Sequence, residues 1–273
     1  MSEAQTPETS PESRHVHDLF DLTGRVAVVT GGAGQYGRHI SAALAEAGAH
    51  VVVASRNLAA CENAVAALTT RGLGASAQPL DLTSERSIRA LRDALLSEHG
   101  RLDILVNNAV YHARGGLEFM SAEDWDAASL ANSKGLFLMT RHCVEPMVCA
   151  GSGSIVNISS IYGVVAPDFS IYPSLESAVA PSYAFEKGGM ISFTRYVASF
   201  YAAKGIRANC ISPSGLETPG LSPEFVSAYR ERTPMGRMAG SDDIKGAVVF
   251  LASDASAFVT GANLIVDGGW TLR

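Results

Sequence analysis

From Arg25 onward, short runs of β-branched residues alternate with longer amphipathic runs rich in Ala and Leu. The short runs predict seven strands, at residues 25–30, 50–55, 75–80, 102–107, 153–159, 206–212 and 263–267. The longer runs predict the helices between them, one ending near Ala47 and others beginning near Leu58, Ser84, Ser121, Ser182 and Ser241. Strands that alternate with helices are typical of βαβ units. The order therefore predicts an α/β fold with a doubly wound, seven-stranded parallel sheet and helices on both faces.

The chain reads as one domain preceded by a tail. Residues 1–18 are polar, contain Pro and Ser, and lack the apolar core of a signal peptide or membrane anchor, so we expect a disordered tail there. No linker-like stretch and no repeat of fixed period divides residues 19–273, which we expect to form a single domain. No apolar run approaches the roughly 20 residues that cross a bilayer.

Charge and cysteine content narrow the class of partner. The formal net charge of −6 argues against nucleic acid and against an anionic membrane, because both require clustered Lys and Arg. A small soluble substrate fits better. The four cysteines, Cys61, Cys143, Cys149 and Cys210, show no CxxC spacing and no adjacent His pair, so no metal site is expected. Their pattern is typical of reduced thiols, and we expect a cytoplasmic protein.

The turn after the first predicted strand reads TGGAGQYG and contains the pattern GxGxxG. It lies between a predicted strand and a predicted helix, as a dinucleotide-binding turn requires. Glycines let the backbone approach a pyrophosphate, whose charge is met by free N–H groups at the start of the helix. A Gly-rich turn that binds nothing is the alternative. We therefore expect a Rossmann domain whose cofactor contacts include Gly31, Gly32, Gly34, Gln35, Tyr36 and Gly37.

The end of the second predicted strand indicates which cofactor binds. An acidic residue there would accept a hydrogen bond from the ribose 2′-OH of NAD. In this chain Ser55 takes that position and Arg56 follows, so a guanidinium that suits a 2′-phosphate replaces the carboxylate. NADP(H) is therefore favoured. NAD(H) is the alternative, with Arg56 as a solvated surface residue.

Tyr183 precedes Lys187 by four residues in APSYAFEKGG, which predicts the start of a helix. Residues four apart share a helix face, so both side chains can point into one cleft. A free phenol has a pKa near 10, and lowering it to about 7 takes roughly 4 kcal/mol of preferential stabilisation of the phenolate. The Lys187 ammonium and an oxidised nicotinamide are sources of that stabilisation. Tyr183 would then exchange a proton with an alcohol or carbonyl while hydride moves to or from nicotinamide.

These features and several further motifs in the same order resemble the short-chain dehydrogenase/reductase family over the whole chain after the tail. The motifs are TGGAGQYG, DL at 81–82, NNA at 107–109, NSKG at 132–135, ISSIYG, YAFEK, NCISPSG and VTGANLIVDGGW. The resemblance implies an oxidoreductase that transfers hydride between NADP(H) and a carbonyl or secondary alcohol. It implies four catalytic residues: Asn132 anchors a water-mediated proton path, Ser160 polarises the substrate oxygen, Tyr183 is the acid/base, and Lys187 lowers its pKa and holds the nicotinamide ribose. Further cofactor contacts are implied for Asp81, Leu82, Asn107, Ala109, Ile211, Pro213 and Thr218.

Two other tyrosines lie upstream of Tyr183. Tyr172 is followed four residues later by Glu176, whose charge would raise the pKa of a phenol, and Tyr162 is followed at the same interval by Ala166. Only Tyr183 has an amine at that interval. The sequence therefore favours Tyr183 as the base.

The chain also departs from the family pattern. The interval between Ser160 and Tyr183 is longer than usual, and we expect the extra segment, within residues 163–181, to cover the substrate pocket. Residues 214–237 contain three prolines and are expected to form a lid loop. The glycine spacing around Gln35 is closer to that of sugar-nucleotide-acting relatives, so a sugar-nucleotide epimerase or dehydratase is one alternative class. A non-catalytic nucleotide-binding sensor is another.

The substrate is the least defined feature. The motifs are similar to those of flagellin-modification, nonulosonate and gluconate-type oxidoreductases, which favours a sugar or sugar acid. A 3-oxoacyl compound or a cyclic ketone is the alternative. The resemblance also implies a homo-oligomer, a tetramer or dimer, formed through the helices that begin near residues 121 and 182. Candidate substrate contacts are Tyr111, His112, Arg114, Tyr162 and Asp168.

Overall fold

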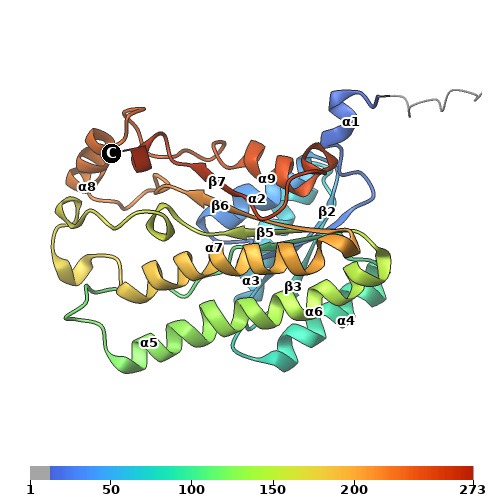
Figure 1. The fold of residues 1–273 in the computed structure, drawn as a ribbon, viewed down its shortest axis with the longest axis horizontal. Helices are drawn as coiled ribbons and strands as arrows, with labels where there is room; N and C mark the ends of the chain where they lie inside the picture. The colour runs from blue at the N-terminus through green and yellow to red at the C-terminus, as the bar shows by residue number, and fades with distance from the viewer. Residues whose placement is uncertain (1–12, 273) are drawn as a thin grey trace, which may run out of the picture.

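The computed structural model describes residues 13–272 and contains a seven-stranded parallel sheet of order β3-β2-β1-β4-β5-β6-β7 (Figure 1). The predicted doubly wound α/β fold is confirmed, and every strand overlaps its predicted run. The strands are β1 Val26–Thr30, β2 His50–Ser55, β3 Ala75–Pro79, β4 Ile104–Asn107, β5 Gly153–Ile158, β6 Ile206–Pro213 and β7 Asn263–Val266.

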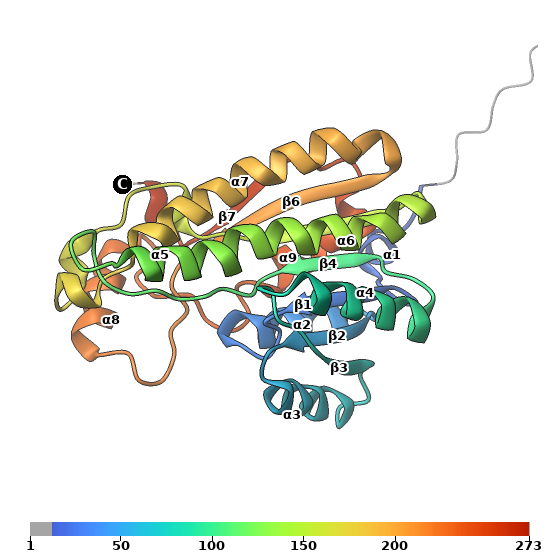
Figure 2. The ribbon, with the colours of Figure 1, turned by 90° about the horizontal axis from the view of Figure 1, so that it is seen from below.

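Helices cover both faces of this sheet, with α2 and α9 on one face and α4 and α6 on the other (Figure 1). Figure 2 shows the long helix α7 running alongside α6. The α-helices are α1 Val16–Phe20, α2 Gln35–Glu46, α3 Leu58–Thr69, α4 Glu85–His99, α5 Ala122–Ala128, α6 Gly135–Ala150, α7 Pro181–Tyr201, α8 Pro223–Arg232 and α9 Lys245–Ala252. The short 3₁₀ helices are η2 Ile161–Gly163, η3 Phe169–Ile171, η4 Leu175–Ser177, η5 Ala202–Lys204, η6 Asp254–Ser256 and η7 Trp270–Leu272, and η1 Ser129–Lys134 is a π-helix.

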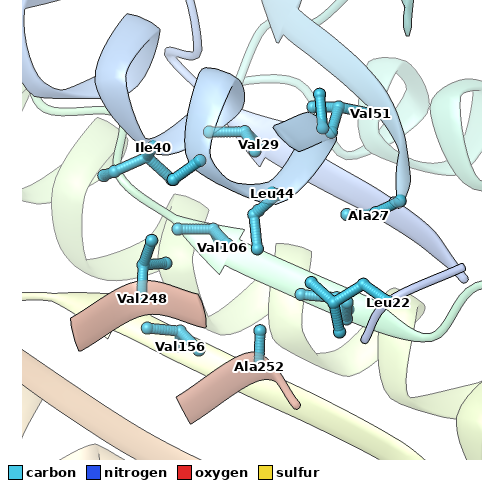
Figure 3. Packing of buried hydrophobic residues seen from close by; sticks show 14 of the residues in the cluster. Leu22, Ala27, Val29, Ile40, Leu44, Val51, Val106, Val156, Val248 and Ala252 are labelled. Atoms are coloured by element: carbon cyan, nitrogen blue, oxygen red, sulfur yellow. The ribbon is translucent and has the colours of Figure 1, made fainter. Parts of the chain in front are cut away.

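Strand β1 shows why the sheet is buried on both sides. All five of its residues are buried, as expected of a parallel strand with helices on both faces. Successive side chains point to opposite faces, so Ala27 and Val29 pack with α2 and α9 while Val26 and Val28 pack with α4 and α6. Figure 3 shows the first of these two cores. The continuous apolar runs in the sequence are therefore the interior of the sheet.

The strand order fixes where a ligand can bind. Strand β1 pairs with β2 on one side and with β4 on the other, so the chain connections diverge between β1 and β4. In open α/β sheets the crevice outside the carboxyl ends of the strands at such a point is the ligand site. The polypeptide directly after β1, β4 and β5 therefore forms the floor of the candidate site.

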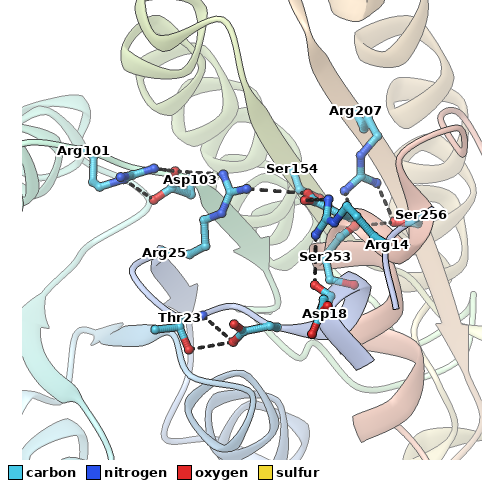
Figure 4. A network of polar contacts seen from close by, with 12 residues as sticks. Arg14, Asp18, Thr23, Arg25, Arg101, Asp103, Ser154, Arg207, Ser253 and Ser256 are labelled. Atoms are coloured by element: carbon cyan, nitrogen blue, oxygen red, sulfur yellow. Dashed lines mark hydrogen bonds and ion pairs between the residues drawn. The ribbon is translucent and has the colours of Figure 1, made fainter. Parts of the chain in front are cut away.

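Contacts with the domain begin within the segment that we predicted to be a tail. Residues 1–12 of the predicted tail lie outside the described residues, whereas residues 16–18 belong to α1. Arg14 forms an ion pair with Asp254 at 2.8 Å and donates to the carbonyl of Asp18 (Figure 4). The predicted tail is therefore too long at its carboxyl end, because contacts with distant residues order this polar segment.

Two predicted helices and one predicted loop differ from the structure. The long helix expected from Ser121 is divided by the π-helix η1 into α5 and α6. The lid loop expected at 214–237 contains α8, because Ser222 caps the helix and Pro223 occupies its first turn, where a missing N–H costs nothing. The last predicted helix begins at Lys245 instead of Ser241. Pro223 therefore marks the start of a helix in a segment interpreted as irregular.

Candidate active site

A cavity of about 1010 Å³ lies at the carboxyl ends of the strands. Its walls come from the turn after β1, the ends of β2, β4, β5 and β6, the start of α7, and the segments around residues 172–179 and 220–229. Most of the sequence-predicted site residues line it. Those lining it are Gly31, Gly34, Gln35, Tyr36, Ser55, Arg56, Asp81, Leu82, Ala109, Asn132, Ser160, Tyr183, Lys187 and Pro213.

The turn between β1 and α2 has the geometry of an anion cradle. Gly31 has a φ of +63°, which favours glycine, and Gly34, the N-cap of α2, provides no side-chain hydrogen bond to the helix. A Cβ at Gly37 would overlap the Gly31 carbonyl oxygen and lie 2.8 Å from the Gly32 Cα, so the helix packs on the turn only because residue 37 has no side chain. The uncapped N–H groups at the start of α2 remain available to an anion. The turn therefore fits a dinucleotide pyrophosphate.

The end of β2 brings a cation and a carboxylate to the cavity. Arg56 is exposed there, and its charge contributes to lowering the pKa of Asp81. The largest causes of that lower pKa are two hydrogen bonds that Asp81 accepts from Thr83, at 2.7 Å from the hydroxyl and 2.9 Å from the N–H. Asp81 is therefore a fixed carboxylate, as recognition of a cofactor's adenine N–H groups requires, and Arg56 is placed to meet a phosphate.

Five of the expected cofactor contacts do not line the cavity, and four of them lie behind its wall. Gly32 and Gly37 form the turn without lining the cavity, and Ile211 is in the hydrophobic core. Asn107 is buried in the sheet, where it donates to Asn157 at 2.8 Å. The neighbouring Asn108, which the sequence did not single out, lines the cavity and donates to the carbonyls of Thr30 and Gly31 at 3.0 Å. Thr218 also lies outside the lining.

Ser160, Tyr183 and Lys187 meet in the cavity from two elements. Ser160 follows β5, while Tyr183 and Lys187 lie one turn apart on α7. The Lys187 ammonium donates to the Ile158 carbonyl at 2.6 Å and lies 5.6 Å from the centre of the Tyr183 ring. The hydroxyl of Ser160 accepts from the Tyr162 N–H at 3.1 Å. These three side chains therefore lie in the same pocket, as we expected from the sequence.

The electrostatics of this group differ from the expected lowering of the tyrosine pKa. Burial raises the pKa of Tyr183, and an interaction with the Ser160 hydroxyl opposes this. Burial lowers the pKa of Lys187 to about 8. The direction of the Tyr183 pKa in the protein alone is therefore set by desolvation of the phenol.

The rival tyrosines are tied to each other. Burial raises the pKa of Tyr162 and of Tyr172, and their hydroxyls are hydrogen-bonded at 3.1 Å. The charge that contributes to raising the pKa of Tyr172 is that of Asp168, so the role expected for Glu176 was wrong. Within residues 13–272, Tyr183 is the one of these three tyrosines with a lysine ammonium over its ring, which agrees with the choice of Tyr183.

The expected substrate contacts fall into two groups. Tyr111, His112, Arg114 and Tyr162 line the cavity, and the His112 ring stacks on Tyr183 with centroids 5.8 Å apart. Asp168 does not line it and instead pairs with Arg232 of α8 at 2.6 Å. The segment between Ser160 and Tyr183 does cover the cavity, since residues 172, 173 and 177–179 are part of its wall.

The described part of the chain lacks the features of two other kinds of site. Residues 13–272 contain no group of three or more His, Cys, Asp and Glu side chains placed to hold a metal ion. No helix within the same residues is long and apolar enough to span a membrane. All four cysteines are free, and three of them are buried.

A glycine cradle and a tyrosine–lysine pair that open onto one cavity define the class, an oxidoreductase built on a dinucleotide-binding domain. The family follows from comparison with known proteins. A family model described as enoyl-(acyl carrier protein) reductase matches residues 33–271. The chain belongs to the short-chain dehydrogenase/reductase family, whose members act on CH–OH groups and the corresponding carbonyls.

Individual relatives match over nearly the whole chain. Cis-4-hydroxycyclohexanecarboxylate dehydrogenase of Sinomonas cyclohexanicum is 38% identical over 251 residues, which are 90% of this chain and 96% of that protein. D-threitol dehydrogenase of Mycolicibacterium smegmatis is 34% identical, covering 93% and 95%. A crystal structure of a gluconate 5-dehydrogenase from Burkholderia cenocepacia J2315, in complex with NADP and tartrate, superposes with a TM-score of 0.86 at 33% identity and covers 95% of this chain and 100% of that one.

Proposed function

We propose that the protein is an NADP(H)-dependent dehydrogenase/reductase of a small hydroxylated carboxylic acid, with a sugar acid as the first candidate. The observation that carries this proposal is that Arg114 lines the same cavity as Ser160, Tyr183 and Lys187. Arg114 has no ion-pair partner within residues 13–272, whereas Arg230 and Arg232 nearby are both paired. An unpaired arginine in a substrate pocket is suited to bind a carboxylate.

Tyr183 and the side chains around it would carry out the proton transfer. The Tyr183 hydroxyl would give its proton to the carbonyl oxygen in reduction and take it back in oxidation, while the Ser160 hydroxyl donates a hydrogen bond to the same oxygen. When bound, NADP(H) supplies or accepts the hydride. Lys187 would hold the nicotinamide ribose and, once that region is occupied, stabilise the phenolate of Tyr183.

The cofactor preference rests on Arg56. A guanidinium pairs with the 2′-phosphate of NADP through charge-assisted hydrogen bonds that the 2′-OH of NAD cannot match. Ser55 at the preceding position brings no carboxylate that would repel the phosphate. The gluconate 5-dehydrogenase with bound NADP supports the same preference.

The walls of the substrate region match a hydroxy acid. Burial and the charges of Lys187 and Arg114 lower the pKa of His112, so Arg114 is the permanent cation of that wall. The cavity lining also carries the hydrogen-bonded hydroxyls of Tyr162 and Tyr172. One bond between two phenols leaves one of their protons free for a substrate oxygen. A molecule with a carboxylate at one end and hydroxyls along its length suits both the arginine and the phenols, and relatives named for gluconate and for a hydroxycyclohexanecarboxylate support this class.

A cyclic alcohol or ketone is the second candidate. Tyr162, Tyr172 and Phe225 all line the cavity, and the rings of Tyr172 and Phe225 are 5.5 Å apart. Such an aromatic wall favours a six-membered carbocycle over an open chain.

The test is a panel of D-gluconate, cis-4-hydroxycyclohexanecarboxylate and cyclohexanol, each with NADP⁺ and NAD⁺, followed by the absorbance of reduced nicotinamide. We expect NADP⁺-dependent turnover and a kcat/KM for at least one carboxylate about 10- to 100-fold above that for cyclohexanol, the range of a hydrogen bond to a charged group. Arg114→Leu should remove this advantage. The control is Arg89→Leu, an exposed arginine on α4 away from the cavity. An unchanged carboxylate preference in Arg114→Leu would contradict the substrate assignment.

We also propose that the chain forms a homo-oligomer, as expected from its family. Apolar side chains on the outer surfaces of η1, α6 and α7 are exposed in the single chain, which favours an interface there. They are Leu130, Phe137, Phe185, Tyr196 and Phe200. Light scattering on the purified protein measures the oligomeric state, and a monomer at all concentrations would refute this. The cytoplasmic location stays a prediction.

A further inference from the structure

A carboxylate that the sequence analysis passed over lies beside the catalytic lysine. Glu186 precedes Lys187 on α7 and is only 7% exposed. Its Oε2 accepts a hydrogen bond from Asn132 Nδ2 at 2.6 Å, while its Oε1 is buried without a hydrogen-bond partner in residues 13–272. Burial raises the pKa of Glu186, and the contacts with Asn132 and Lys187 oppose this. A carboxylate held this way is costly to the fold, so its position suggests a role in the site.

The Asn132 amide connects Glu186 to the substrate side of the cavity. Its Oδ1 accepts from the N–H of Tyr111 at 2.7 Å, and its Nδ2 donates to the carbonyl of Tyr111 at 2.9 Å. These two bonds clamp the backbone of Tyr111. The second hydrogen of Nδ2 goes to Glu186, so both donors of the amide are used. Three segments, α7, η1 and the loop after β4, therefore meet at one amide.

The hydrogen bonds between Asn132 and Tyr111 also affect the position of His112, the next residue in the loop, which contacts Tyr183. His112 follows Tyr111 and stacks on the Tyr183 ring, with an interplanar angle of 22°. Tyr183 and Glu186 lie on the same helix, three residues apart. The loop is thus tied to α7 at two points, by stacking on Tyr183 and by hydrogen bonding to Glu186 through Asn132.

We infer that Glu186 is a positioning residue, which holds the 110–114 loop against Tyr183 by fixing the side chain of Asn132. The role depends on an acceptor atom at the position of Oε2. Loss of the acceptor leaves a buried N–H of Asn132 unpaired and removes the only hydrogen bond between Asn132 and α7 in the described residues. The loop that carries His112 and Arg114 then loses one of its two attachments to α7.

Hydrogen exchange tests the clamp without a substrate. In Glu186→Leu, which preserves volume, and in Glu186→Ala, we expect a peptide covering residues 108–116 to exchange about tenfold faster, as loss of a buried hydrogen bond predicts. Glu186→Gln keeps an acceptor oxygen and should exchange like the wild type. The control is Ser182→Ala, one turn earlier on the same buried face, whose hydroxyl makes no hydrogen bond within residues 13–272. Unchanged exchange in Glu186→Leu and Glu186→Ala, or equally fast exchange in Glu186→Gln, would overturn the inference.

Kinetics separate positioning from a general structural role, and this arm rests on the proposed function. With 4-oxocyclohexanecarboxylate and NADPH, Glu186→Leu should lower kcat/KM for the ketone about tenfold while leaving the Kd of NADPH within about twofold, and Glu186→Gln should restore most of the activity. Equal losses in Glu186→Gln and Glu186→Leu would overturn the positioning role. If the wild type does not turn over this ketone, this compound is excluded as a substrate, and the exchange result alone decides the role of Glu186.

Discussion

Replacing Gly37 with Ala tests whether the close packing of α2 on its own turn creates the dinucleotide site. The added Cβ would overlap the Gly31 carbonyl oxygen and lie 2.8 Å from the Gly32 Cα and 2.9 Å from the Asn108 Nδ2. Carbon atoms in contact prefer about 3.5–4.0 Å, so the backbone of the turn must move by about 1 Å. Overpacking of this kind costs about 1–3 kcal/mol.

The displaced turn should harm both stability and cofactor binding. We expect Gly37→Ala to lower the free energy of unfolding by about 2 kcal/mol and to weaken NADPH binding at least about tenfold, since tenfold corresponds to about 1.4 kcal/mol. Urea unfolding and titration of NADPH fluorescence measure the two quantities. The matched control is Gly189→Ala in α7, where a Cβ would meet no atom within 4 Å. This variant should gain about 0.5–1 kcal/mol from helix propensity and bind NADPH normally. A Gly37→Ala protein with wild-type stability and affinity would refute the reasoning.

Three further predictions concern the site. Tyr183→Phe should lower turnover at least about 100-fold, the contribution of general acid–base catalysis, while the Kd of NADPH stays within about threefold; retained turnover would remove Tyr183 from the reaction. Arg56→Ala should weaken NADPH binding about 10- to 100-fold and NADH binding about twofold at most, and equal losses would overturn the cofactor preference. The pKa of Lys187 is about 8 in the folded protein and near 10.4 when unfolded, so between these values the unfolded chain holds more protons and the free energy of unfolding rises with pH. The gain should reach about 2 kcal/mol relative to Lys187→Met in unfolding measured from pH 8 to 10, and identical pH dependences would contradict it.

The parts of the fold that were predictable depend on local pattern. Strand β1 reads as a continuous apolar run because both of its faces are buried. The turn that follows is recognisable from its glycines, because a positive φ such as that of Gly31 favours glycine. The pair Tyr183 and Lys187 shares a helix face by spacing alone. These features need no knowledge of distant contacts.

The features that were missed depend on distant contacts. Asn107 and Asn108 are adjacent, and only the register of β4 against β5 decides that Asn107 faces Asn157 while Asn108 reaches the turn. The π-helix at Asn132 lies in a segment whose apolar periodicity alone predicts an uninterrupted helix. Its nearest sequence signal is Gly135, where a Cβ would lie 2.9 Å from Leu82.

The electrostatics of Tyr183 and Glu186 could not be predicted for a related reason. Spacing indicated a neighbouring ammonium for Tyr183, but the balance of its pKa is set by burial, which is a property of the assembled cavity. Glu186 gives one signal in sequence, a carboxylate three residues after Tyr183 on a predicted helix. A role for this carboxylate can be inferred only from the structure, which shows the hydrogen bond that it accepts from Asn132.

The wall of the substrate region is a joint between two chain segments. Arg114 pairs with Val179 in an isolated antiparallel bridge, the Gly115 N–H donates to Ala178, and the Gly116 N–H donates to Leu175. The two segments belong to different crossovers of the sheet, yet each supplies the backbone partners of the other. A design that changes the substrate specificity must therefore replace both segments together. A loop replaced alone would lack the backbone hydrogen-bond partners that the other segment provides.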